Sequence, residues 1–187
     1  MRDALLVAAE EQLEEEGPAG LSLRKLGRAL GVSPGAPYRH FEDKDALLIE
    51  LSTIGFKRLH TMMLAEQDGA VGGEERLRRG GIGYLKFAYA HPGLFRLVFG
   101  WMPSGDAPQR SESGDAAFAG LVDILEQCSR ESLLRLGTME AGLLAWSAVH
   151  GAAFLMIDNN LKLCDMEPDP EMIGNQLHDA LWSGIAK

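Results

Sequence analysis

Residues Leu21–Phe41, LSLRKLGRALGVSPGAPYRHF, constrain the fold more than any other stretch, because they hold two short helical patterns joined by a tight turn. The first pattern has an apolar face at helical spacing, made of Leu23, Leu26, Ala29 and Leu30. The opposite face carries Arg24, Lys25 and Arg28. Two short helices around a glycine turn are typical of a helix-turn-helix.

Both helices have recognisable ends. Ser22 is a candidate N-cap of the first, and Gly31 stands where a helix commonly ends in a left-handed residue. Ser33 is a candidate N-cap of the second helix, with Pro34 in its first turn. This second helix ends in residues whose side chains suit phosphate oxygens and base edges, namely Tyr38, Arg39, His40 and Phe41. We interpret it as a recognition helix.

The charge of this segment differs from that of the whole chain. The net charge is -9 and the pI is about 5.0, which by themselves argue against nucleic acid as a partner. Residues 17–41, however, contain four cations and no Asp or Glu. A locally positive surface on an acidic protein favours DNA binding, and we expect the acidic remainder to suppress unspecific binding.

The same residues resemble the DNA-binding domain of the TetR family of bacterial transcriptional regulators. The resemblance lies in Arg24-Lys25-Leu26, Gly31-Val32-Ser33, Tyr38-Arg39-His40-Phe41 and Lys44. It implies that Tyr38, His40 and Lys44 hold phosphates, while Arg24 and residues 35–39 face the bases. Where Pro34, Ala36 and Pro37 depart from the family pattern, base reading would rest on Arg24, Arg39 and apolar contact with thymine methyl groups. The full candidate DNA-binding set is Ser22, Arg24, Lys25, Ser33, Gly35, Ala36, Pro37, Tyr38, Arg39, His40 and Lys44.

The rest of the chain also has helical periodicity, and no strand is needed anywhere. Beyond the helix-turn-helix we expect helices at residues 3–16, 44–66, 74–90, 94–100, 114–136, 139–161 and 169–185, and a mobile loop at 101–113. Three glycines in 74–90 each cost about 1 kcal/mol, so a close helix contact is their expected reason. We therefore predict an all-α fold with an N-terminal three-helix DNA-binding domain at 1–46. Residues 47–187 would form a helical bundle for ligand binding and dimerisation.

Composition and motifs bound the function classes. No run of about eighteen apolar residues occurs and acids interrupt the start, so we expect a cytoplasmic protein without a membrane partner. The five histidines lack metal-site spacing, and Cys128 and Cys164 read as small apolar residues, so neither a metal nor a cofactor is expected. Gly31-Val32-Ser33-Pro34-Gly35 matches the G-x-S-x-G elbow of hydrolases. That elbow follows a strand and uses the next N–H as an oxyanion donor, whereas here a helix precedes it and Pro34 has no N–H.

The body offers a candidate dimer interface and a candidate ligand pocket. A single helix-turn-helix contacts few base pairs, so two-fold dimers on half-sites of a palindromic operator are expected. The candidate interface lies on the last two helices and comprises Leu143, Val149, Ala153, Phe154, Ile173, Leu177 and Leu181. Trp146, His150 and Gly151, with Ala90-His91-Pro92 and Phe95, resemble one C-terminal subgroup of the same family. The candidate pocket comprises Phe87, Leu94, Phe95, Phe99, Leu121, Leu125, Trp146 and His150, and an ordinary filled core, with a hydrogen-bonded His150, is the alternative.

Taken together, these patterns predict a homodimeric DNA-binding regulator, which we interpret as a repressor responsive to an unidentified small-molecule effector. We do not expect an enzyme, because no nucleophile, base and oxyanion donor come together. Two alternatives stay open: a helical protein-interaction module, and a small helical enzyme without DNA binding.

Overall fold

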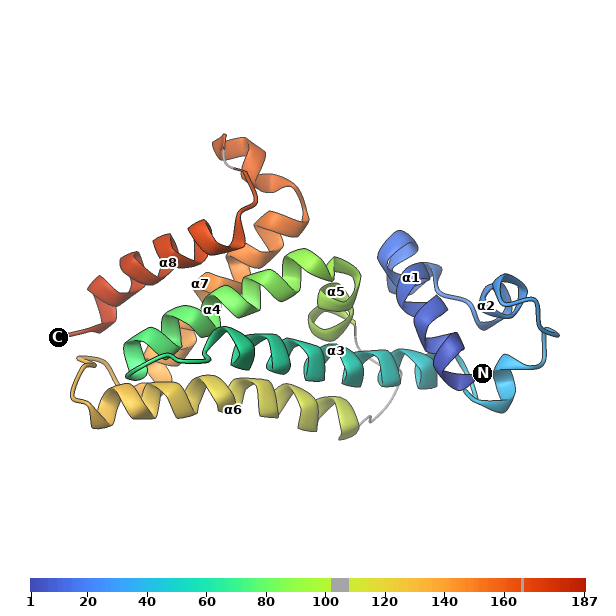
Figure 1. Ribbon diagram of the computed structural model, residues 1–187, viewed down its shortest axis with the longest axis horizontal. Coiled ribbons are helices and arrows are strands. Elements are labelled where there is room, and N and C mark those ends of the chain that lie inside the picture. The colour runs from blue at the N-terminus through green and yellow to red at the C-terminus, as the bar shows by residue number, and fades with distance from the viewer. Residues whose placement is uncertain (102–107, 166) are drawn as a thin grey trace. The chain divides into compact units, whose positions relative to one another are not determined.

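The computed structural model describes residues 1–101, 108–165 and 167–187, and these are helical almost throughout (Figure 1). The elements are α1 (Arg2–Gly20), α2 (Leu23–Ala29), η1 (Pro37–Arg39), α3 (Lys44–Glu66), α4 (Gly73–Ala90), α5 (Pro92–Gly100), α6 (Pro108–Arg130), α7 (Thr138–Ile157), η2 (Asn160–Cys164) and α8 (Pro170–Ile185). Within the described residues, β-type pairing is limited to one isolated bridge between Leu134 and Ala186. The predicted all-α fold is confirmed.

The chain divides into two compact units. The head unit comprises residues 1–57 and 91–114, and the body unit comprises 58–90 and 115–187. α3 contributes its first part to the head unit and its second part to the body unit. α5 belongs to the head unit although it follows α4 in sequence. The predicted domains, 1–46 and 47–187, are functional assignments and stay predictions.

The core of the head unit is formed by α1, α2, α5 and the start of α3. Leu5, Ala9 and Leu13 of α1 are buried, as are Phe41 before α3 and Leu47 in its first turn. α1 was predicted to end at residue 16, but it runs to Gly20 across a break at Gly17, whose φ of 67° and ψ of -179° are not helical. A glycine adopts this conformation without strain, and Pro18 then starts the last turn.

The N-terminus of α5 is hydrogen-bonded to α1. The Glu14 carboxylate accepts hydrogen bonds from the N–H groups of Gly93 at 2.5 Å and Leu94 at 3.3 Å. The two backbones approach so closely that a Cβ at position 93 would lie 2.8 Å from the Leu13 carbonyl oxygen. Because the first N–H groups of a helix have no partner within the helix, Glu14 acts as a cap supplied by another element.

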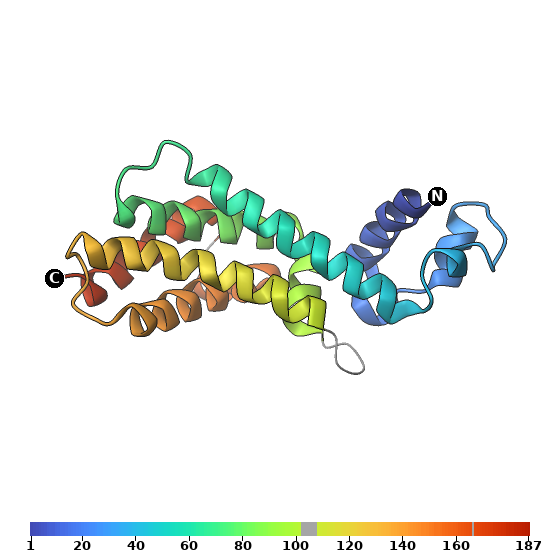
Figure 2. The ribbon, with the colours of Figure 1, turned by 90° about the horizontal axis from the view of Figure 1, so that it is seen from below.

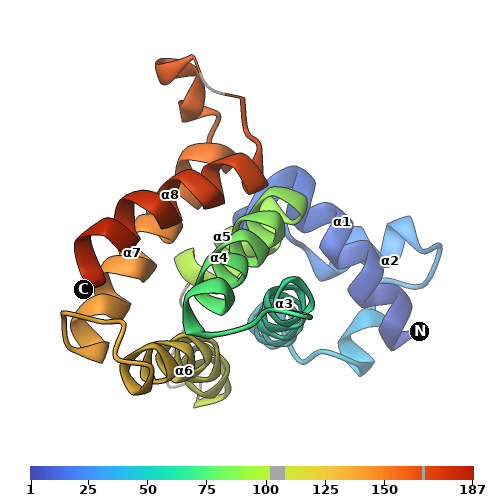
Figure 3. The same ribbon diagram turned by 60° about the vertical axis from the view of Figure 1, so that its left-hand side comes forward.

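The body unit is built around α4, which packs against α7 and α8, as Figures 2 and 3 show. Its core also takes residues from α6 and from the C-terminal end; the cluster comprises Leu77, Ile124, Leu125, Cys128, Leu134, Ala141 and Ile185. The predicted reason for the glycines of α4 is confirmed at Gly83, where a Cβ would lie 2.7 Å from Met63 Cα on α3. It is not confirmed at Gly81, where a Cβ would meet nothing within 4 Å.

α6 differs from its predicted range at both ends. It begins at Pro108 instead of 114, so residues 101–107 of the predicted mobile loop remain, and 102–107 lie outside the described residues. It ends at Arg130 instead of 136, because Ser132 takes a φ of 59° and the next residues pair with the C-terminal end. There Arg135 N–H donates to the Ile185 carbonyl and Lys187 N–H to the Leu133 carbonyl, both at 2.9 Å.

α7 is shorter and more exposed than expected. It ends at Ile157 rather than 161, and Asn159 then turns the chain with a φ of 58°. Its apolar sequence predicts burial on several sides, yet Met139, Leu143, Leu144 and Leu155 are exposed on the single chain. By length and composition alone, α7 is the one helix of the described residues that could cross a membrane, a test that core helices of soluble proteins also pass.

Candidate nucleic-acid interface

α2 carries its cations outward. Leu23 and Leu26 are buried, whereas Arg24, Lys25 and Arg28 are exposed, as the helical pattern predicts. Ser22 occupies the N-cap position with an extended φ of -148°, although its side chain makes no capping hydrogen bond. α2 therefore presents three basic side chains from one short helix.

The turn after α2 has the geometry that glycine allows. Gly31 has a φ of 67°, its N–H donates to the Arg28 carbonyl at 3.0 Å, and Val32 N–H donates to the Gly27 carbonyl at 2.9 Å. A Cβ at Gly27 would lie 3.1 Å from Pro37 Cγ. Gly27 thus permits the close approach of η1 to α2.

The second helix begins later than predicted. Ala36, and not Ser33, is its N-cap, and η1 covers only Pro37–Arg39 as a 3₁₀ turn. The cause is the missing N–H of Pro37, which cannot donate to the Ser33 carbonyl, so Ala36 N–H donates there instead at 2.9 Å. The N–H groups of His40 and Phe41 both donate to the Pro37 carbonyl.

The structure brings most of the predicted DNA-binding residues to the surface of this short segment. Ser33, Gly35, Tyr38, Arg39 and His40 are exposed, and Ala36 is half-buried. Pro37 differs, because its ring is buried against Gly27 in a packing position. Which of these residues touch DNA stays a prediction.

The first turn of α3 is fixed by two polar contacts. Asp43 Oδ1 accepts from Ala46 N–H at 2.8 Å, as the side chain of an N-cap residue does. Lys44 is half-buried, and its Nζ donates to the Ala19 carbonyl at 2.9 Å. Lys44 therefore also ties α3 to the end of α1, a role that its spacing in the sequence did not indicate.

Sequence reasoning missed Glu16. Its Oε2 lies 2.6 Å from Lys25 Nζ, and this contact with Lys25 holds the pKa of Glu16 below its usual value, aided by Gln12. The sequence pattern of α1 alone places its acidic run on a solvated face, and only the break at Gly17 shows how one of these acids reaches α2.

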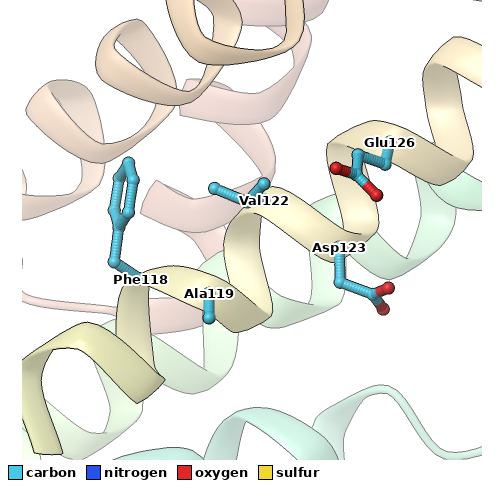
Figure 4. Close-up of a pocket in the computed structure, with 5 residues that line it drawn as sticks. All are labelled: Phe118, Ala119, Val122, Asp123 and Glu126. Atoms are coloured by element: carbon cyan, nitrogen blue, oxygen red, sulfur yellow. The ribbon is translucent and has the colours of Figure 1, made fainter. Parts of the chain in front are cut away.

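The predicted ligand residues are divided between the two units. Leu94, Phe95 and Phe99 lie in the head unit; Phe87, Leu121, Leu125, Trp146 and His150 lie in the body unit. Phe87 and Leu125 are fully buried, while Trp146 is 38% exposed. A hollow in the body unit follows one face of α6 and is lined by Phe118, Ala119, Val122, Asp123 and Glu126 (Figure 4). The predicted pocket stays a prediction.

Tyr84 is a second residue that sequence reasoning missed. Its hydroxyl lies 2.7 Å from His150 Nδ1, and the Trp146 and His150 rings are 5.8 Å apart between centroids. Burial raises the pKa of Tyr84, and burial lowers the pKa of His150. Both groups therefore favour their neutral forms, which can share a single O–H···N hydrogen bond. The apolar pattern of α4 gave no sign of this pair.

The predicted dimer residues have different environments in the single chain. Leu143 is 61% exposed, whereas Ala153 and Ile173 are buried in the chain's own core. Val149, Phe154, Leu177 and Leu181 are half-buried. Their assignment to an interface stays a prediction.

Two family matches cover most of this architecture. Residues 5–51 match the bacterial regulatory proteins of the tetR family, and residues 77–181, more than half of the chain, match the tetracyclin repressor-like C-terminal domain. The chain belongs to the TetR family. The predicted class, an all-helical DNA-binding transcriptional regulator of this family, is confirmed.

Solved structures of similar proteins agree with this assignment. A Rhodococcus sp. RHA1 protein of unknown function is 33% identical, with a TM-score of 0.88 over 100% of this chain and 95% of that one. A putative TetR family transcriptional regulator from Vibrio parahaemolyticus is 25% identical, with a TM-score of 0.73 over 100% of this chain and 98% of that one.

The nucleoid occlusion factor SlmA of Aliivibrio fischeri is 35% identical over 104 residues, which is 53% of this chain. The match spans 51% of that relative's length, so the chain covers about half of the curated relatives that it matches.

Proposed function

We propose that this TetR family protein is a homodimeric repressor that binds a palindromic operator and is released by a small-molecule effector. One observation carries the DNA-binding part: the head unit exposes Arg24, Lys25, Arg28 and Arg39 together with Tyr38 and His40 on α2 and η1. Cations of this kind contact phosphates and guanine edges, and the segment has no acid of its own. Residues 1–46 would form the DNA-binding domain.

A second copy of the chain would supply the second half-site. The exposed apolar side chains of α7, with Leu143 at 61% exposure, give a single chain an uncovered face that pairing would bury. α8 packs against α7 and contributes the half-buried Leu177 and Leu181. Two α7–α8 pairs would form a four-helix interface.

The effector site would lie in the body unit near Trp146, His150 and Gly151, the motif that resembles one C-terminal subgroup of the family. Tyr84 and His150 offer a neutral hydrogen-bonded pair beside aromatic rings, which suits a mostly apolar molecule with one polar group. We expect Trp146→Ala to lose the response to the effector while keeping operator binding. Neither an enzymatic activity nor a cofactor enters this proposal.

DNA binding is tested with the DNA that flanks the protein's own gene. Fluorescence anisotropy with labelled fragments, competed by unlabelled random-sequence duplex, separates specific from unspecific binding. Arg130→Ala is the control for Arg39→Ala, because Arg130 is also exposed but lies on α6. Binding that Arg39→Ala and Arg130→Ala weaken equally would contradict an interface on η1.

A further inference from the structure

One carboxylate at the end of α1 is held against the helix-turn-helix. Glu16 Oε2 lies 2.6 Å from Lys25 Nζ, and Gln12 Nε2 donates to Glu16 Oε1 at 3.3 Å. The hydrogen bond with Lys25 contributes most to lowering the pKa of Glu16, so this carboxylate is ionised at neutral pH. Lys25 is thus already paired with an anion in the free protein.

The backbone around this pair is shaped to hold it. The positive φ of Gly17 lets residues 18–20 turn, and Gly20 then comes against the Glu16 side chain. A Cβ at position 20 would lie 2.7 Å from Glu16 Oε2 and would also collide with Glu16 Cβ. The carboxylate therefore lies where any other residue at position 20 would place its side chain.

Gln12 also binds the backbone between the end of α1 and the start of α2. Its Nε2 also donates to the Gly20 carbonyl at 3.5 Å, and its Oε1 accepts from the N–H of Ser22, the N-cap of α2, at 3.4 Å. Glu16 is consequently one member of a small network that joins the end of α1 to the start of α2. Such a network favours one position of the carboxylate over the many that an exposed glutamate samples.

We propose that Glu16 competes with DNA phosphate for Lys25 and thereby lowers the affinity of the protein for DNA of unrelated sequence. The inference rests on the proposed function, in which Lys25 faces DNA. A carboxylate and a phosphate bind the same ammonium group, so DNA gains the Lys25 contact only by displacing Glu16. Lys25 is 55% exposed, so a phosphate can reach it. Unspecific binding depends almost entirely on such cations, so one occupied lysine weakens it measurably.

The test uses the full chain and a fluorescein-labelled random-sequence duplex in anisotropy titrations over a range of salt concentrations. We expect Glu16→Gln to bind roughly 3- to 10-fold tighter near 0.1 M salt, and its log–log salt slope to steepen by about 0.9, the value for one added phosphate contact. Glu15→Gln is the matched control, since it removes the same charge from the neighbouring exposed position. Its effect, acting only at long range, is expected to stay below about twofold.

Two further variants separate the pair from a general charge effect. Lys25→Ala is expected to abolish the gain, so that with alanine at position 25 the Glu16→Gln substitution no longer tightens binding to the random duplex. Gly20→Ala leaves every charge in place and displaces the Glu16 carboxylate by steric conflict, so it is expected to reproduce the gain. Circular dichroism and thermal unfolding establish that each variant is folded.

The outcomes distinguish the inference from the proposed function. Equal gains for Glu16→Gln and Glu15→Gln, or a gain that persists without Lys25, would overturn the inference while leaving DNA binding intact. If the natural chain bound neither its flanking DNA nor the random duplex, the proposed function would fall, and this inference with it.

Discussion

At the residue scale, Arg39 and Lys44 are expected to differ in what they do for DNA binding. Arg39 is exposed on η1, so we expect Arg39→Ala to weaken operator binding by about 1–3 kcal/mol and to relax one base position. Lys44→Ala is expected to weaken binding to all sequences alike. Competition binding against single-mismatch operators measures both, and unchanged discrimination in Arg39→Ala would remove it from the base readers.

His150 predicts a pH dependence of stability. Burial lowers its pKa in the folded protein below the ordinary 6.5, so between these two values the unfolded chain binds a proton that the folded chain does not. The free energy of unfolding therefore falls as the pH drops through 6.5. Urea unfolding at pH 7.5 and 5.5 is expected to show this loss, and His150→Gln to reduce it. The exposed His60→Gln is the control; a pH effect that both variants keep in full would assign it to other groups.

The candidate site could be predicted only as far as helical periodicity reaches. The outward cations of α2 follow from the spacing of Leu23 and Leu26, and the left-handed Gly31 follows from its place after the last apolar residue. The Glu16–Lys25 pair could not be predicted in this way, because the non-helical backbone at Gly17 lies between the two residues and helical periodicity does not continue across it. The contact between Tyr84 and His150 joins two helices far apart in sequence, which is a matter of packing and not of local pattern.

At the element scale, two glycines of α4 form a matched test of helix packing. A Cβ at Gly83 would meet the backbone of α3, which cannot give way as a flexible side chain can, so we expect Gly83→Ala to destabilise the protein by about 1–3 kcal/mol. A Cβ at Gly81 meets open space, so Gly81→Ala is expected to stabilise it by about 0.5–1 kcal/mol. Urea unfolding measures both, and effects of the same sign would mean that α3 and α4 are not in close contact.

Helix bounds were predictable where the chain carries its own stop signals. α3 has its predicted range, from a start capped by Asp43 to the glycines that follow Glu66. α6 was predicted six residues too long at its C-terminal end, because Leu133 and Leu136 continue the apolar pattern. In the structure these two side chains pack against the body core beside the bridge between Leu134 and Ala186. The local pattern could not predict this bridge, because its two residues are about fifty positions apart.

At the scale of the whole molecule, α7 shows why an apolar helix alone does not reveal what covers it. A core helix and an interface helix have the same composition, and only the packing of the single chain distinguishes them. Because Leu143 is exposed, we expect Leu143→Glu to convert a dimer of about 40 kDa, twice the 20.3 kDa chain, into a monomer. Light scattering at micromolar concentration measures this.

Leu64→Glu is the matched control for this test, since Leu64 is 50% exposed but lies on α3. A natural chain that is already a stable monomer at micromolar concentration would contradict the dimer. A dimer that Leu143→Glu and Leu64→Glu disrupt equally would place its interface elsewhere.

The capping of α5 by Glu14 bears on how this protein can be divided for experiments. A fragment that stopped at residue 57 would contain the whole helix-turn-helix but would lack α5. The first N–H groups of α5 donate to the Glu14 carboxylate, and its backbone lies close to the Leu13 carbonyl. Val98, which packs on Gly55, would be missing as well. A DNA-binding fragment of this chain therefore needs residues 91–100 supplied by a short linker, and grafting its head onto a foreign body requires that α5 travel with it.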